Sequence, residues 1–167
     1  MRRLALVVLG ILLLGVAAPV AAQEATPEAS PAPMGSVDIT PVDGVVTFTV
    51  LEVPASDAVV DLAPTGDSAG DLLVFANIVM TEDGSAQVGT DQGWCIRTDV
   101  AAGAWECTWT LFLAQGQLVV QGPYFDAAAS TLAVIGGTGD FAGATGQMEL
   151  ATVDAGITFT YVVDVGE

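Results

Sequence analysis

The chain of 167 residues contains no lysine and no histidine, and its only basic side chains are Arg2, Arg3 and Arg97. This lack excludes nucleic acid as a partner, because nucleic-acid binding depends on basic contacts to phosphate. It also excludes histidine general bases, Schiff-base lysines and lysine-based phosphate sites. Any chemistry must therefore use carboxylates, tyrosine, amides, backbone groups or a thiol.

Long hydrophobic runs are also scarce, and the one that exists is at the N-terminus. Arg2 and Arg3 precede the apolar stretch Leu4–Val16, and residues 20–22 form a small-residue cleavage site, so residues 1–22 are predicted to be a secretory signal peptide. An uncleaved membrane anchor is the alternative. Cleavage leaves one basic side chain against 20 acidic ones, a formal charge of −19. That charge repels anionic membranes and favours solubility, so we expect a secreted protein with no membrane association.

Only two cysteines are present, Cys95 and Cys107. Two thiols without histidine supply too few ligands for a structural metal site, so no metal is expected. A lone pair in an exported chain usually forms a disulfide, and the short spacing fits a hairpin. The sequence therefore predicts a Cys95–Cys107 disulfide. In that register Arg97 and Trp105 face each other, which allows a cation–π contact.

Composition divides the remaining chain into two parts. Residues 23–44 mix proline with alanine, threonine, serine and glutamate, which predicts a disordered linker. From 45 to 167, short strand-like runs alternate with turn signals and no long window has a helical period. We expect an all-β domain, an eight-stranded antiparallel β-barrel, with a two-sheet sandwich as the alternative. The expected strands are 45–53, 71–80, 86–97, 104–114, 117–124, 131–136, 145–153 and 157–164.

Alternation along the strands identifies polar side chains on apolar faces. Glu52 shares a face with Phe48 and Val50, so desolvation is expected to raise its pKa, as is common at catalytic sites. Asn77 shares a face with Phe75 and could orient a ligand or pair with Glu52. Tyr124 could donate its hydroxyl into a cavity.

Each of these candidates also has a structural interpretation. Glu52 is close to Pro54 and could reach solvent at the barrel mouth, Asn77 could satisfy a backbone group, and Tyr124 could be packing with its hydroxyl at the rim. Residues 82–84 and Asp91 offer oxygen ligands for calcium, but their spacing matches no calcium loop, so a solvated turn is favoured.

Several short motifs, in order, resemble the allene oxide cyclase family and, more distantly, the plant dirigent proteins. The likeness runs from about residue 51 to residue 163. The motifs are Gly70-Asp71-Leu72 followed by Phe75-x-Asn77, Gly93-Trp94-Cys95, Gln121-Gly122-Pro123-Tyr124, Leu132-Ala133-Val134-x-Gly136-Gly137 and Gly143-x-x-Gly146-Gln147.

The resemblance implies an eight-stranded barrel around an apolar cavity, and a homo-oligomer, since the family often forms trimers. In the plant cyclases a glutamate, an asparagine, a tyrosine and a cysteine line the cavity, where an unstable fatty-acid epoxide is cyclised without a cofactor. Glu52, Asn77, Tyr124 and Cys95 match those places. Two departures matter: Pro54 replaces a polar residue, and a disulfide would consume the Cys95 thiol.

Three functions remain open from the sequence. The first is a secreted barrel that binds an apolar small molecule in its cavity. The second is a cofactor-free isomerase or cyclase, or a dirigent-like protein, in which Glu52 stabilises developing positive charge. The third is a structural barrel with a filled core and no ligand.

Overall fold

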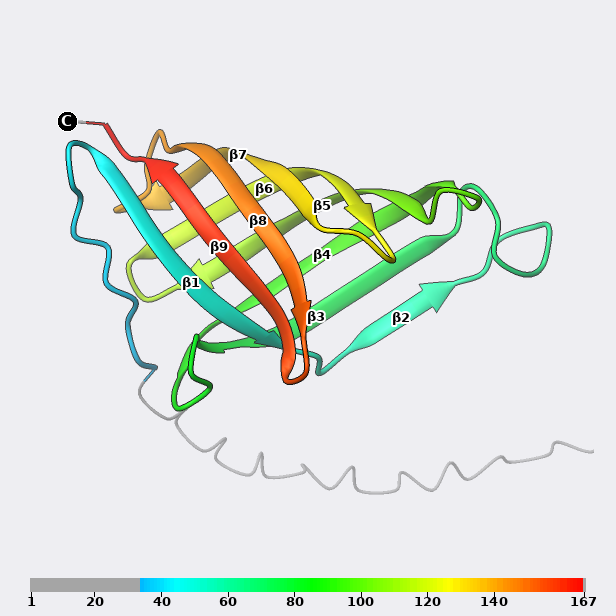
Figure 1. The fold of residues 1–167 in the computed structure, drawn as a ribbon, viewed down its shortest axis with the longest axis horizontal. Helices are drawn as coiled ribbons and strands as arrows, with labels where there is room; N and C mark the ends of the chain where they lie inside the picture. The colour runs from blue at the N-terminus through cyan, green and yellow to red at the C-terminus, as the bar shows by residue number, and fades with distance from the viewer. Residues whose placement is uncertain (1–33, 167) are drawn as a thin grey trace, which may run out of the picture. The chain divides into compact units, whose positions relative to one another are not determined.

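The computed structural model describes residues 34–166, and the expected signal peptide lies outside them. In this part the chain forms nine strands joined by turns, without a helix (Figure 1). The strands are β1 (Val45–Val53), β2 (Asp57–Val60), β3 (Leu72–Thr81), β4 (Gln87–Asp99), β5 (Ala104–Leu113), β6 (Gly116–Phe125), β7 (Ser130–Gly139), β8 (Thr145–Val153) and β9 (Gly156–Asp164).

The strands close into a barrel. Each strand from β3 to β9 pairs antiparallel with the next, β9 pairs with β1, and β1 pairs with β3. The predicted eight-stranded antiparallel barrel is therefore confirmed, and the sandwich alternative is wrong. All eight expected strands are present, whereas β2 was not expected. Between residues 34 and 166 the chain has no helix of the length and apolar character needed to span a bilayer.

The extra strand β2 continues the line of β1 after an interruption. Both strands pair with the same edge of β3, with Val53 opposite Ile78 and Asp57 opposite Phe75. Residues 54–56 thus lie across from only two residues of β3. Pro54 accounts for the interruption, because it has no N–H group to donate to the ladder.

One end of the barrel is filled by aromatic side chains. Phe48 of β1 stacks on Tyr161 of β9 with ring centroids 5.0 Å apart, and Phe141 lies 6.2 Å from Phe48. Phe141 comes from the turn between β7 and β8 and is fully buried. Burial of such large apolar side chains is the main driving force for folding, and it closes this end of the barrel.

The segment before β1 packs on the barrel. The Gly35 amide donates to the Gln87 carbonyl at 2.8 Å, and Gln115 Nε2 donates to the Val37 carbonyl at 2.8 Å. Val37 and Ile39 are partly buried against the core. This part of the linker expected over residues 23–44 therefore contacts the barrel, because apolar residues alternate with polar ones among the prolines.

Candidate functional site

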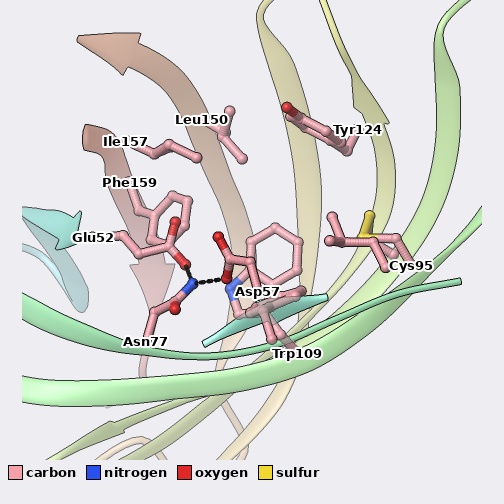
Figure 2. A pocket seen from close by; sticks show the side chains of 12 residues that line it. Glu52, Asp57, Asn77, Cys95, Trp109, Tyr124, Leu150, Ile157 and Phe159 are labelled. Atoms are coloured by element: carbon pink, nitrogen blue, oxygen red, sulfur yellow. Dashed lines mark hydrogen bonds between the residues drawn. A yellow bond between two sulfur atoms is a disulfide. The ribbon is translucent and has the colours of Figure 1, made fainter. Parts of the chain in front are cut away.

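The end of the barrel away from Phe141 contains a cavity of about 150 Å³ (Figure 2). Its wall is mostly aliphatic and aromatic, with a polar group at one side. The lining residues are Glu52, Asp57, Leu73, Phe75, Asn77, Cys95, Cys107, Trp109, Tyr124, Leu150, Ile157 and Phe159. The structure therefore brings the three predicted site residues, Glu52, Asn77 and Tyr124, to one cavity.

Asn77 bridges the interruption between β1 and β2. Its Oδ1 accepts hydrogen bonds from the amides of Ala55 at 2.7 Å and Ser56 at 3.1 Å. Its Nδ2 donates to Glu52 Oε1 and to Asp57 Oδ1, both at 2.8 Å (Figure 2). One amide thus satisfies the two free backbone donors and holds two carboxylates side by side. Asn77 therefore satisfies backbone groups and also pairs with Glu52, the two roles that the sequence offered as alternatives.

Glu52 does not reach solvent. The residue is 4% exposed, so its burial disfavours the charged form and raises its pKa. The hydrogen bond from Asn77 lowers the pKa in part, and the charge of Asp57 raises it further. The direction agrees with the expectation from strand alternation.

Asp91 is a buried carboxyl on β4, so the strand expected over 86–97 is present and the solvated turn favoured for Asp91 is wrong. It is 1% exposed and lies opposite Asn77 in the β3–β4 ladder. Burial and the nearby charge of Glu52 raise the pKa of Asp91 to about 8, and neither Asp91 oxygen has a hydrogen-bond partner among the described residues. Asp91 lies behind the cavity wall rather than on it.

Gly93 makes room for this arrangement. It lies on the same face of β4 as Asp91 and Cys95 and opposite Trp109 of β5. A Cβ atom at residue 93 would overlap the Cβ of Trp109. Only glycine therefore lets the Trp109 side chain occupy the cavity floor between Asp91 and the disulfide.

Two further polar groups are buried in the same interior. Trp109 Nε1 and the Tyr161 hydroxyl have no hydrogen-bond partner among the described residues. Burial raises the pKa of Tyr161, and the charges of Asp91 and Glu52 raise it further. Tyr161 therefore remains a neutral hydrogen-bond donor near the carboxyl pair.

Tyr124 lies across the cavity from the carboxylates, on β6 (Figure 2). It is half-buried, and desolvation raises its pKa, with smaller contributions from the charges of Asp126 and Glu52. Beside it, Cys95 and Cys107 form the predicted disulfide. Because this bond consumes the thiol, Cys95 cannot act as the free cysteine that the resemblance implies.

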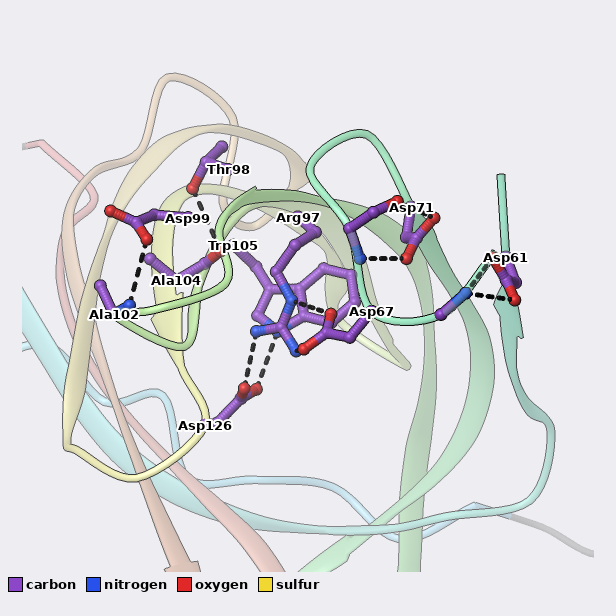
Figure 3. A network of polar contacts seen from close by, with 12 residues as sticks. Asp61, Asp67, Asp71, Arg97, Thr98, Asp99, Ala102, Ala104, Trp105 and Asp126 are labelled. Atoms are coloured by element: carbon purple, nitrogen blue, oxygen red, sulfur yellow. Dashed lines mark hydrogen bonds and ion pairs between the residues drawn. The ribbon is translucent and has the colours of Figure 1, made fainter. Parts of the chain in front are cut away.

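Arg97 is engaged outside this cavity (Figure 3). Its Nε lies 2.8 Å from Asp67 Oδ1 and its Nη1 lies 2.6 Å from Asp126 Oδ2. The guanidinium also lies over Trp105, 4.0 Å from the ring centroid, which confirms the expected cation–π contact. Arg97 thus holds the 61–70 loop against the barrel, and no basic side chain lines the cavity.

Within residues 34–166, no group of three or more histidine, cysteine, aspartate or glutamate side chains is arranged to hold a metal ion. The cavity offers acceptors at one side, one phenol at the other and apolar surface between them. Such a site can accept hydrogen bonds, stabilise positive charge or remove a proton.

The comparisons with known proteins agree with this architecture. The allene oxide cyclase family model matches residues 48–164. The chain is also similar to the solved structure of a pyocyanin demethylase, with 26% identity and a TM-score of 0.64 over 70% of this chain and 99% of that chain.

Two other solved structures share the fold at lower identity. One is an exo-specific intermolecular Diels–Alderase, with 14% identity and a TM-score of 0.60 over 71% of this chain and 96% of that chain. The other is a pterocarpan synthase dirigent protein, with 17% identity and a TM-score of 0.57 over 71% of this chain and 87% of that chain. Since the family match covers most of the sequence and the whole ring of strands closes as this fold requires, the chain belongs to the allene oxide cyclase family.

Proposed function

We propose that the barrel is exported and binds a small, largely apolar molecule in its cavity. The observation that carries this proposal is a pocket of about 150 Å³ with an apolar wall and one polar side formed by Glu52, Asp57 and Asn77. An engineered cavity of about this volume in another protein holds benzene, so the enclosed part fits a ring or a short apolar segment. The Cys95–Cys107 disulfide is compatible with an oxidising compartment.

The charge of the wall restricts the chemistry of the ligand. Glu52 and Asp57 are acceptors, and no arginine, lysine or histidine lines the pocket. A carboxylate on the ligand would be repelled and left without a donor of opposite charge. A neutral ligand with an N–H or O–H donor, or a cationic one, matches the site. The similar pyocyanin demethylase and Diels–Alderase are, by name, enzymes that act on small organic molecules, which supports this class of ligand.

A matched pair of probes tests the proposal. Indole-3-acetamide and indole-3-acetate have the same ring and nearly the same size, but only the second is an anion. We expect saturable chemical-shift changes at the Trp109 indole N–H with the acetamide, and binding about tenfold weaker or more with the acetate, which corresponds to about 1.4 kcal/mol. Equal affinity for both would contradict the charge argument.

A cavity-filling variant tests where the probe binds. Leu73 lines the pocket, whereas its neighbour Val74 points outward and is exposed. Leu73→Trp is therefore expected to abolish binding, and Val74→Trp to retain it. If neither indole-3-acetamide, benzene nor naphthalene gives saturable shifts, the filled-barrel alternative is the better description.

A further inference from the structure

We propose that Glu52 and Asp91 share one proton and work as an acid–base pair that moves a proton on the molecule bound in the cavity. This inference rests on the proposed function, since it needs a bound small molecule. It adds a reaction class, a cofactor-free isomerisation by proton transfer, and a second residue, Asp91, that strand patterning did not identify.

Two buried carboxyl groups flank Asn77, Glu52 through the hydrogen bond from its side chain and Asp91 opposite it in the β3–β4 ladder. Two ionised carboxylates have no donor to offer each other, so a buried pair is stable only when one of them is protonated. With both ionised, neither Asp91 oxygen has a hydrogen-bond donor among residues 34–166. A buried carboxylate without a donor is costly, and one retained proton removes that cost.

The surroundings place this proton on Asp91. Glu52 already accepts a hydrogen bond from Asn77 at 2.8 Å, which stabilises its charge, whereas Asp91 accepts none from a neutral donor. The proton is therefore more stable on Asp91. The basic residue that could neutralise a second charge, Arg97, is paired with Asp67 and Asp126 instead.

The other titratable groups that face the pair do not replace this proton. Asp57 from β2 adds negative charge, and Tyr161 from β9 and Tyr124 from β6 have raised pKa values and stay neutral. The interior thus contains several acceptors and no cation, a setting in which two close carboxyl groups titrate in separate steps.

The geometry divides the roles. Glu52 lines the cavity and can touch a ligand, so it is the catalytic residue, whereas Asp91 acts through Glu52 and is a positioning residue. Glu52 takes a proton from a C–H group next to a carbonyl, and the electron pair of that bond moves to the carbonyl oxygen to give an enolate. Glu52 then returns the proton to a different atom. The net change is an isomerisation that consumes no oxidant or reductant, and Tyr124 on the opposite wall is a donor for the enolate oxygen.

A probe reaction tests the pair without knowledge of the natural substrate. In 5-nitrobenzisoxazole, a base removes the carbon-bound proton, the electron pair of that bond forms the nitrile, and the N–O bond breaks to release a coloured phenolate. We expect wild type to catalyse this reaction with saturation. Glu52→Gln should lower kcat about 100-fold or more, a typical loss for a general base. The matched control Glu106→Gln, on the outer face of β5, should leave the rate unchanged.

The pH profile tests Asp91. The wild-type rate is expected to change in two steps, the upper one near pH 8, where Asp91 loses its proton. Asp91→Asn keeps Glu52 in place but cannot titrate, so its profile should contain one step. A variant profile identical to that of wild type would overturn the role of Asp91.

An infrared measurement without ligand tests which carboxyl group holds the proton, independently of the activity of the variants. Infrared spectra of wild type near neutral pH should contain the carbonyl band of a protonated, buried carboxyl group, which Asp91→Asn lacks and Glu106→Gln retains. Persistence of this band in Asp91→Asn would overturn the assignment of the proton.

Binding of the inert analogue 5-nitroindazole separates the two proposals. If the analogue binds and wild type does not accelerate the probe reaction, the acid–base inference fails while the binding function stands. If the analogue does not bind, the acid–base inference fails, and the binding function is decided by indole-3-acetamide, benzene and naphthalene.

Discussion

Replacing Asp91 with asparagine should make the protein more stable at neutral and alkaline pH. The pKa of Asp91 is raised to about 8 in the folded protein, against about 3.9 for an aspartate in an unfolded chain. Between these values the folded state holds a proton that the unfolded state has released, so the free energy of unfolding falls by about 1.4 kcal/mol for each pH unit. Asparagine resembles the protonated carboxyl group in shape and does not titrate. The stability advantage of Asp91→Asn over wild type should therefore widen with this slope up to about pH 8 and then become constant.

Urea unfolding, followed by tryptophan fluorescence at several pH values, measures this difference directly. The control is Glu106→Gln, in which an exposed carboxyl on the outer face of β5 is removed. Its stability curve should run parallel to that of wild type. Four other carboxyl groups, Asp38, Asp71, Asp83 and Asp126, have lowered pKa values because they accept hydrogen bonds, so their effect on stability has the opposite dependence on pH. They contribute equally in all variants. A difference between Asp91→Asn and wild type that does not depend on pH would refute the reasoning.

Three further outcomes follow from the packing. Denatured, unreduced protein should contain no free thiol, and two free thiols in wild type would contradict the pairing. Replacing both Cys95 and Cys107 with serine should lower the free energy of unfolding by about 3 kcal/mol in the chain-entropy description. Arg97→Gln should lower the free energy of unfolding by only about 1 kcal/mol, because the carboxylate partners of Arg97 are half exposed. The same change should speed proteolysis within residues 61–70. An unchanged cleavage rate would mean that the ion pairs do not hold that loop. Phe141→Ala should lower the free energy of unfolding, measured in urea, by about 3–5 kcal/mol. Probe binding should be unchanged, because Phe141 fills the end of the barrel opposite the cavity. Loss of binding would show that the two ends are coupled.

Strand alternation was sufficient to predict the strands and much of the interior, and the family resemblance favoured the barrel over the sandwich. A strand with one buried face has a period of two, so the run from Val46 through Phe48 and Val50 fixed the direction of Glu52. The same reasoning placed Asn77 on the same face of its strand as Phe75. Tyr124 was a candidate because its hydroxyl could enter a cavity, and the family resemblance supported it, but its position across from Glu52 depends on the closure of the barrel rather than on a local pattern.

The short strand β2 could not be found in this way. It has four residues, all exposed, and it follows Pro54 in a stretch of turn-forming residues. Its existence depends on pairing with β3, which is a tertiary effect. Asp57 was missed for the same reason, because its contact with Asn77 exists only once β2 has docked.

Asp91 carried a signal that was available in the sequence. It lies four residues before Cys95 on the same strand, so a disulfide that points inward requires Asp91 to point inward too. The intervening Gly93 and the polar neighbours Thr90 and Gln92 hid the alternation. A register argument from the cysteines, rather than hydrophobicity, would have identified this buried carboxyl.

The interruption between β1 and β2 has a consequence for how such barrels diversify. The registers of β1 and β2 on β3 are set independently, and three residues, 54–56, connect them across a gap of two. A change in the length of this connection would move Asp57 and the rim of the pocket without shifting any strand pair of the ring. Selection can therefore alter the ligand preference here while the ladder that carries the stability stays unchanged.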